Sequence, residues 1–393
     1  MRIGMYCNWG VKRVDGGFYV PAIHEKYLRA FREKANGSLV LLSKLDTSAV
    51  KESDVFIADS DVEILPLPPF KSYLHSIKCL PQIAAGLFHF ARKCQYYYIR
   101  TFEPFSWLLP FFKRSGAVLN YHFVANPFEA IWGNSKSTLP VKVLRSVVFY
   151  PEFFLTCVAA AVSRSSCNGP SVLPRVPFFL RRRMNVVIES TLQESDYFER
   201  QFVGECEKIK ILSVGYLRYA KGTGDLINAL ALFKEWVPNA KFILSIVGDG
   251  EDRLNLEEMV NSLGLQSEVV FYGHQSGRTL SERYEENDVF VMPSHAETGP
   301  RVLLEAMARG MFCISTDVGY VRTVLSYNEN LQGIIVEKNS PLEICKALNW
   351  YLGHRSEARS MSMNAFEASK RYSMKGFVNL IFPGQSFVST SQR

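Results

Sequence analysis

The 393-residue chain lacks low-complexity tracts and has no repeat of solenoid length. Its 21% of charged and 47% of hydrophobic residues are an ordinary globular balance. Among its eight cysteines there is no Cys-x2-Cys pair, and none has a histidine at zinc-site spacing. These absences argue against a disordered chain, a solenoid and a structural zinc site. The scattered cysteines fit a reducing compartment, so we expect a cytoplasmic protein.

Long hydrophobic runs are also scarce. The opening Met1-Arg2-Ile3-Gly4-Met5-Tyr6 is typical of a strand rather than of a cleavable signal peptide. Residues 146–162 lack lysine and arginine, but Pro151-Glu152 interrupt the run, which is short for a membrane span. We therefore expect no transmembrane helix there. A segment lying at a membrane surface stays open as an alternative.

Charge is divided unevenly along the chain. Through residue 190 there are 24 Lys and Arg against 13 Asp and Glu (24 − 13 = +11), and the remainder has 21 against 25, or −4. The basic half predicts an anionic partner, and no nucleic-acid-binding motif accompanies it. Its densest run, Arg181-Arg182-Arg183, follows Phe178-Phe179-Leu180. This combination suits an anionic membrane surface, with peripheral association at the inner face of the cell membrane, as well as a solvated loop.

Strand and helix patterns alternate without a break over residues 208–352. Such alternation predicts right-handed βαβ units on a parallel sheet with helices on both faces. The expected strands are 209–214, 242–247, 269–272, 289–292, 312–316 and 333–336, and the expected helices are 223–236, 252–263, 279–286, 300–309, 320–325 and 341–352.

The first 185 residues show a weaker pattern of the same kind. The chain is long for a single core, so we predict an α/β protein with two Rossmann-like domains. The domains are expected at 1–185 and 186–365, with a partly helical tail at 366–393. The strands expected in the first domain are 3–6, 39–42, 55–57, 97–100, 118–121 and 158–163.

Two glutamates, Glu297 and Glu305, follow the strand expected at 289–292. Thr298 or Gly299 can cap the next helix, with a proline in its first turn. Glu297 then lies at the carboxyl end of a strand, where open α/β sheets bind ligands, and Glu305 in the second helical turn. Two carboxylates beside a helix N-terminus suit a ligand rich in hydroxyls with an anion nearby. Ordinary surface charges are the alternative.

The segment around these glutamates resembles the Glu-x7-Glu signature of the retaining glycosyltransferases of group 1, family 4. The resemblance includes the Pro-Ser before the first glutamate and Leu-Leu-Glu-Ala-Met-Ala-x-Gly after it, and covers most of residues 208–352. It implies the GT-B architecture, two Rossmann-like domains facing across a cleft that holds the active site. It also implies that Glu297 contacts the donor sugar and Glu305 the ribose. Thr298 and Arg301 depart from the family pattern.

A loop with glycines at both ends, Gly215 and Gly222, follows the first strand of the second domain. It resembles the family's Gly-Arg…Lys-Gly loop, whose cations hold the donor diphosphate. Lys221 matches the family lysine, whereas Tyr216 replaces the arginine and Arg218 is the local substitute. The negative charge of a leaving diphosphate needs such cations, which makes Lys221 a candidate catalytic residue. An exposed loop beside a helix start is the alternative.

Further candidates carry weaker patterns. Gly250 resembles the family's Gly-x-Gly turn near the nucleotide, and Gly299 accompanies the first glutamate. Gly16 and Gly17 resemble the loop that faces the donor phosphates, although a simple turn is an alternative. His122, expected just past a strand end, matches a family histidine that contacts the donor sugar. A structural role is its alternative.

Asp59-Ser60-Asp61 has the form of the Asp-x-Asp metal motif of the other glycosyltransferase fold. It occurs early in the first domain without a nucleotide-binding context, so we expect a surface turn and predict no metal. We also predict no cofactor, because the donor is itself a UDP- or GDP-linked sugar.

These features together predict a retaining, metal-independent glycosyltransferase. It would move a sugar from a nucleotide-sugar donor to a glycan or lipid-linked acceptor in surface polysaccharide or glycolipid biosynthesis. Two alternatives stay open. One is a GT-B sugar-nucleotide epimerase, and the other is a catalytically weakened sugar-nucleotide-binding protein, which Tyr216 and Thr298 favour.

Overall fold

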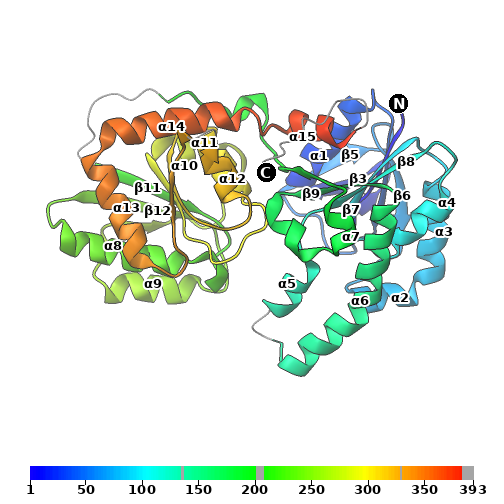
Figure 1. Cartoon of the computed structure of the whole chain (residues 1–393), viewed down its shortest axis with the longest axis horizontal. Coiled ribbons are helices and arrows are strands. Elements are labelled where there is room, and N and C mark those ends of the chain that lie inside the picture. Colours follow the sequence, from blue (N-terminus) through cyan, green and yellow to red (C-terminus); the bar gives the residue numbers. More distant parts are fainter. Residues whose placement is uncertain (134–136, 201–207, 328–329, 383–393) are drawn as a thin grey trace. The chain divides into compact units, whose positions relative to one another are not determined.

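The structure, a computed structural model, describes residues 1–133, 137–200, 208–327 and 330–382 (Figure 1). It divides into two compact units. The first unit is Met1–Thr191 together with the stretch that begins at Met374, and the second is Leu192–Ser373. Each unit contains a large parallel sheet, so the predicted α/β class with two Rossmann-like units is confirmed.

The unit boundaries lie a few residues beyond the predicted 185 and 365. Strand β10 (Met184–Val187) completes the first sheet, which keeps the chain in the first unit as far as Thr191. Helix α14 (Arg355–Ser369) runs past residue 365 and packs against β15 (Phe312–Thr316) of the second unit. The chain then joins the first unit again at Met374.

The sheet of the first unit has the order β10-β9-β8-β7-β1-β4-β6 and is parallel throughout. The direction in which strands are added reverses between β1 and β7, which makes this point the switch where ligand crevices form. The other strands are β1 (Ile3–Tyr6), β4 (Leu39–Lys44), β6 (Glu63–Leu67), β7 (Tyr96–Thr101), β8 (Val118–Phe123) and β9 (Arg164–Asn168).

Helices cover both faces of this sheet. Tyr97 and neighbouring side chains pack on one face with α3 and α6, whereas Tyr98 packs on the other with α1 and α15. Side chains alternate between faces along a strand, which is why consecutive tyrosines enter different cores. The helices are α1 (Ala22–Lys34), α2 (Tyr73–Lys78), α3 (Leu80–Phe90), α4 (Leu109–Phe112), α5 (Pro127–Trp132), α6 (Leu139–Ala161), α7 (Phe178–Arg181) and α15 (Met374–Ile381).

Helix α6 corrects two expectations. The strand predicted at 158–163 is wrong, because α6 runs to Ala161 and the strand is β9, whose sequence Arg-Ser-Ser-Cys-Asn is polar. Pro151-Glu152 also do not interrupt the helix. The Glu152 carboxylate is buried, where it accepts hydrogen bonds from the Phe105 amide (2.8 Å) and the Trp107 indole (3.0 Å). Among described residues α6 is the one helix whose length and composition would allow it to cross a membrane.

A small antiparallel sheet stands apart from the large one. It pairs β2 (Lys12–Val14) with β3 (Gly17–Pro21) and β3 with β5 (Asp54–Ala58). The strand predicted at 55–57 is therefore present, but it belongs to this small sheet. Asp59-Ser60-Asp61 follows β5 as a turn, and both carboxylates are paired, Asp59 with Arg13 (2.7 Å) and Asp61 with Arg32 (2.6 Å).

The second unit has a parallel six-stranded sheet in the order β13-β12-β11-β14-β15-β18, and its switch point lies between β11 and β14. Its other strands are β11 (Lys208–Val214), β12 (Lys241–Val247), β13 (Val269–Phe271), β14 (Val289–Met292) and β18 (Ile334–Val336), with a short pair β16 (Ser326–Tyr327) and β17 (Asn330–Leu331). Its other helices are α8 (Thr223–Trp236), α9 (Arg253–Ser262), α10 (Gly277–Glu286), α11 (Arg301–Met307), α12 (Val321–Leu325) and α13 (Pro341–Gly353).

One buried carboxylate, that of Glu189, ties several elements of the first unit together. It accepts a hydrogen bond from the Tyr27 hydroxyl of α1, and its Oε1 lies 2.5 Å from the guanidinium Nη1 of Arg100 on β7. Its Oε2 lies 3.9 Å from Nε2 of His122 on β8. The Arg100 charge and these hydrogen bonds outweigh burial and hold the pKa of Glu189 well below its ordinary range.

Glu189→Gln should lower the free energy of unfolding of the first unit by about 3–5 kcal/mol, because it leaves the Arg100 charge without its partner. A folded-state pKa below the unfolded value of about 4.3 gives stability that is present above that pH and lost as the pH falls. Urea denaturation at pH 7 and pH 4 measures both effects, and the difference from the unsubstituted protein should shrink at pH 4. Glu367→Gln, at an exposed pair with Lys370, is the control. An equal loss in both variants contradicts the prediction.

Candidate functional site

The loops after β11 and β14 meet at the switch point of the second unit. Strands β11 and β14 are hydrogen-bonded neighbours, with Ile211 paired to Val289 and Leu212 to Phe290. Since both strands are parallel, their carboxyl ends deliver the two loops to the same edge. The backbone amide of His295 donates to the Ala220 carbonyl oxygen (2.9 Å) and joins the loops directly.

Gly222 is required where these loops touch. Its φ of +66° lies in the left-handed region, and a Cβ atom placed on it would lie 2.0 Å from the Pro293 carbonyl oxygen. Only glycine accommodates both conditions. The residue is also the N-cap of α8, so the first amides of that helix begin beside the loop after β14. This geometry is typical of an anion-binding helix start.

Lys221 and Glu297, the two candidate catalytic residues of this unit, are brought together. The Lys221 ammonium donates to Oε1 of Glu297, to which the Ser294 hydroxyl also donates (3.3 Å). The side chains keep 21% and 14% of their surface exposed, so a ligand can reach both. A phosphate that approached Lys221 would compete with Glu297 for the ammonium, whereas a sugar hydroxyl could bond to the released carboxylate.

Glu305 lies on α11, and its Oε2 accepts a hydrogen bond from the Tyr284 hydroxyl of α10 (2.9 Å). The tyrosine is buried and the glutamate partly exposed, so this bond orients the carboxylate. Helix α11 begins at Arg301 with Pro300 as its N-cap, which corrects the expected cap at Thr298 or Gly299. Gly299 therefore lies in the loop that carries Glu297, one residue before the cap.

The other predicted residues of this unit have different surroundings. Arg218 is exposed, and no described residue forms an ion pair with it, so its charge is available to a ligand. Tyr216 is 57% exposed beside Gly215. Gly250 packs tightly, because a Cβ there would lie 2.2 Å from the Leu217 carbonyl oxygen, which shows a structural reason for this glycine.

His295 is a site residue that the sequence reasoning missed. Its Nε2 lies 2.8 Å from Oδ2 of Asp225 in the first turn of α8, and its ring contacts the edge of Tyr219. The pair links the loop after β14 to the start of α8, which positions Glu297 against Lys221. Its place in Pro293-Ser294-His295, directly after an expected strand, was the available signal.

In the first unit, His122 is placed differently from the prediction. It lies within β8 rather than past its end, and it is fully buried. Its Nδ1 is 2.9 Å from the Ser166 hydroxyl, and its ring stacks on Tyr98 and meets Phe377 of α15 edge-on. Burial lowers the pKa of His122, which favours the neutral imidazole. A contact with a donor sugar stays a prediction.

Gly16 lies in the turn between β2 and β3, and Gly17 is the first residue of β3. Gly16 has a φ of +78°, and a Cβ on Gly17 would lie 2.3 Å from the Ile57 carbonyl oxygen of β5. The turn that the sequence left open as an alternative is therefore present. A contact of this turn with donor phosphates stays a prediction.

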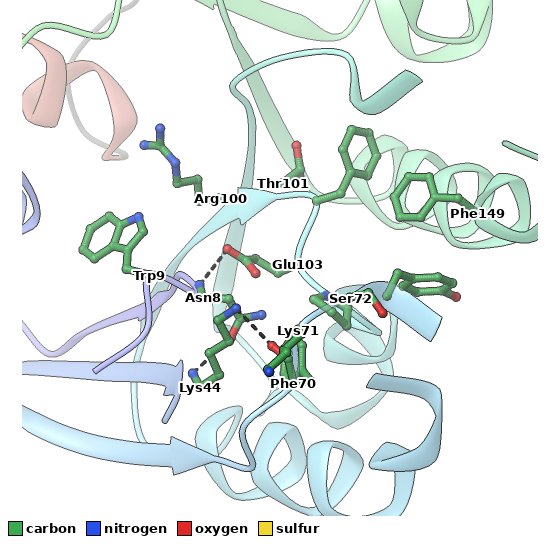
Figure 2. A pocket seen from close by; sticks show the side chains of 13 residues that line it. Asn8, Trp9, Lys44, Phe70, Lys71, Ser72, Arg100, Thr101, Glu103 and Phe149 are labelled. Atoms are coloured by element: carbon green, nitrogen blue, oxygen red, sulfur yellow. Dashed lines mark hydrogen bonds between the residues drawn. The ribbon is translucent and has the colours of Figure 1, made fainter. Parts of the chain in front are cut away.

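A second group of residues that sequence reasoning missed lines a pocket of about 360 Å³ in the first unit (Figure 2). It includes Asn8 after β1, Lys44 at the end of β4 and Glu103 after β7. Each follows or ends a strand that was predicted, and this position was the signal that could have found them. Among the described residues, no cluster of three or more His, Cys, Asp or Glu side chains could hold a metal ion.

Comparison with known proteins places this geometry in context. Residues 197–368 match the family model of glycosyl transferases group 1, which confirms the resemblance seen in the sequence. An uncharacterized glycosyltransferase of Methanocaldococcus jannaschii is 36% identical over 154 residues, 39% of this chain and 38% of the relative. The N-acetyl-alpha-D-glucosaminyl L-malate synthase of Bacillus anthracis is 31% identical over 175 residues, 44% of each chain. These matches thus span less than half the length of the curated relatives.

Solved structures share the fold over nearly the whole chain. The glycosyltransferase WaaG, which is involved in lipopolysaccharide biosynthesis, has a TM-score of 0.66 at 15% identity and covers 97% of this chain and 100% of its own. Anabaena HepE in complex with UDP has a TM-score of 0.64 at 14% identity and covers 97% and 98%. At such identities the likeness shows the fold, which is that of the GT-B glycosyltransferases.

Proposed function

Because residues 197–368 belong to the group 1 glycosyltransferases, we propose that this protein transfers a sugar from a UDP- or GDP-linked donor to a glycan or lipid-linked acceptor. The observation that carries the proposal is the Lys221–Glu297 pair at the switch point of the second unit. There a cation, a carboxylate and the first amides of α8 converge, a combination suited to a diphosphate joined to a sugar.

Sugar transfer with retention needs little from the protein beyond placement and charge. The acceptor hydroxyl forms a bond to the anomeric carbon on the face from which the diphosphate leaves, as the bond between that carbon and the diphosphate oxygen breaks. The hydroxyl proton passes to the departing diphosphate. Lys221, Arg218 and the amides at the start of α8 stabilise the charge that develops, so the reaction proceeds without a metal ion.

The two glutamates have separate parts in this proposal. Glu297 exchanges its bond to Lys221 for the donor sugar's hydroxyls, so it acts at the reacting ring. Glu305, oriented by Tyr284, binds the ribose hydroxyls. A ribose contact is present both before and during the reaction, so Glu305 contributes to affinity, whereas the charge of Lys221 contributes to rate.

We also propose that the first unit binds an anionic membrane surface. Helix α6 exposes Leu139, Leu144 and Val147 by 64%, 61% and 64%, while its second half is anchored by buried residues such as Phe153 and Cys157. Lys142 and Arg145 lie among the exposed apolar side chains. A partly docked helix with apolar and basic side chains is suited to lie at the membrane interface. This placement would bring a lipid-linked acceptor of surface polysaccharide or glycolipid synthesis within reach.

The arginine run near α7 is less free than its sequence suggests. Arg181 donates to the Pro174 carbonyl oxygen (2.6 Å) and Arg183 to that of Ala161 (2.8 Å), while Arg182 lies over the Phe178 ring. Neutralising all three would disturb the backbone as well as the charge. The apolar side chains of α6 are therefore the better test of membrane binding.

Lys221→Ala should lower turnover by about 10²–10³-fold, the scale for losing one preorganised stabiliser of developing charge. Initial rates with UDP- and GDP-linked sugars, with a chelator present, measure this. Lys234→Ala, which breaks the pair with Glu268 at the other end of α8, is the matched control and should keep full activity. A chelator that abolished nucleotide binding would overturn the metal-free mechanism. Binding without turnover of any donor would instead support the weakened binding protein.

Glu305→Ala should weaken binding of the free nucleoside diphosphate about 10–100-fold, since a hydrogen bond to a charged group contributes about 1.5–3 kcal/mol. Isothermal titration calorimetry measures the change. Tyr284→Phe keeps the carboxylate but removes the bond that orients it, so its effect should be smaller. Unchanged affinity in the Glu305 variant would refute the ribose assignment.

Leu144→Glu combined with Val147→Glu should reduce binding to anionic vesicles at least about tenfold, because two apolar side chains lose their burial in the interface. Sedimentation with phosphatidylserine-containing and neutral vesicles across a salt series is the measurement. Leu254→Glu on α9, 72% exposed in the second unit, is the control. Equal binding by the double variant, or no preference for anionic vesicles, would exclude this docking surface.

A further inference from the structure

The first unit has a ligand-sized pocket at its own switch point. Its lining comes from the carboxyl ends of adjacent strands, with Asn8 and Trp9 after β1, Lys44 ending β4, and Arg100 and Thr101 ending β7 (Figure 2). The volume of about 360 Å³ falls within the range of small-molecule sites. The position is where an open parallel sheet places a ligand.

Aromatic rings form much of the pocket wall. Tyr73, Phe102 and Phe149 pack edge to face, with ring centroids 5.1 Å apart for Tyr73–Phe149 and 5.9 Å for Phe102–Phe149. The Tyr73 hydroxyl donates to Glu152 (3.2 Å), and Trp9 stacks on His24 at 4.4 Å. These contacts fix the rings without a ligand. Flat apolar walls with a few polar groups suit the C–H faces and hydroxyls of a sugar.

Two lysines bring positive charge to the pocket. Lys44 is half-buried, and its ammonium donates to the Phe70 carbonyl oxygen (3.2 Å). Lys71 is exposed on the loop before α2. Neither has a carboxylate partner within ion-pair distance among the described residues. Arg100 differs, because its guanidinium is held by Glu189. The two ammonium groups are thus available to an anion.

Glu103 is the one carboxylate among the lining residues. Its Oε1 accepts a hydrogen bond from the backbone amide of Asn8 (2.7 Å), and the side chain is buried. Burial raises the pKa of Glu103 to about 8, against the opposing effect of that hydrogen bond and of Arg100 and Lys44. Tyr6, the last residue of β1, and Cys7, which follows it, also face Glu103 and stay neutral, because burial raises the pKa of each. Below about pH 8 the protonated Glu103 therefore adds no negative charge beside Lys44 and Lys71, and the net positive charge of the lining is at its largest.

We propose that this pocket binds the acceptor and selects a sugar that carries a negative charge, a carboxylate or a phosphate, which pairs with Lys44 and Lys71. The aromatic wall holds the ring, and the Glu103 side chain hydrogen-bonds to the sugar. The inference rests on the proposed function, to which it adds the chemical class of the acceptor. A neutral sugar cannot form an ion pair with either lysine, so the site favours negatively charged sugars over neutral ones.

Isothermal titration of the full-length protein with four compounds tests the proposal. They are methyl glucuronide, glucose 6-phosphate, methyl glucoside and inorganic phosphate. We expect at least one charged sugar to bind tenfold or more tightly than both the neutral sugar and phosphate. Which of the two charged sugars binds identifies the anion. Equal affinity for charged and neutral sugars, or phosphate binding as tightly as the tighter of the two charged sugars, would overturn the proposal.

Variants separate the pocket from the donor site. Lys44→Met and Lys71→Met should each reduce charged-sugar affinity at least fivefold and leave nucleoside diphosphate affinity unchanged. Lys78→Met, at an exposed lysine of α2, is the matched control and should change neither. If both pocket variants bound the charged sugar normally, the proposal would fail even with donor binding intact. If the unsubstituted protein bound no nucleotide-sugar donor, the proposed function itself would be rejected.

The pH dependence tests the part of Glu103. In the unsubstituted protein, charged-sugar affinity should fall as the pH rises from 7 to 9, because Glu103 loses its proton and places a negative charge beside the anion. Glu103→Gln stays neutral and can still accept the Asn8 hydrogen bond, so its affinity should stay flat over this range. An equal fall of charged-sugar affinity in both proteins would show that Glu103 does not act on the bound sugar.

Discussion

The pairing of β11 with β14 is the constraint on which the candidate donor site depends. Parallel strands are joined by long crossover connections. On either side of the β11–β14 pair these connections lead away in opposite directions, so a crevice is left between the loops that follow the two central strands. These loops carry Lys221 and Glu297, and the close approach of Gly222 to Pro293 fixes their spacing. The same arrangement recurs in the first unit, where β1 and β7 are the central strands and the pocket around Glu103 lies above them.

The second unit could be predicted from sequence almost strand by strand. Its strands are apolar runs such as β14 and β15, which match the predicted 289–292 and 312–316. The first unit could not be predicted in this way, because the pattern of polar and apolar residues in some of its elements does not match which of their residues are buried. Strand β9 is polar and yet buried, and α6 carries an apolar run with a proline inside. Buried serine and asparagine side chains form hydrogen bonds within the sheet, as Ser166 does with His122. Because the partner lies on another strand, the sequence around the buried residue does not reveal it.

The residues of the two sites also differ in how far the sequence predicts them. Lys221 and Glu297 belong to a motif in which spacing along the chain predicts proximity, and the structure pairs them. Lys44 and Glu103 come from strands far apart in sequence, so their convergence depends on strand order, which a single sequence does not reveal. His122 illustrates the limit of position alone. It lies one residue before the strand's end, and this small difference accompanies complete burial.

Helix α15 has a consequence for how the protein is made. Phe377 of α15 packs against Tyr27, and Phe382, just after the helix, packs against Phe31, so the core of the first unit includes side chains that follow the whole second unit in sequence. Between Thr191 and Met374 a ribosome must add 373 − 191 = 182 residues, which takes about 10–40 s at ~5–20 residues per second. Through that interval the apolar side chains that α15 covers in the folded unit have no helix to pack against them. Uncovered apolar surface of this kind favours aggregation, so we expect the nascent first unit to need protection until α15 has been made.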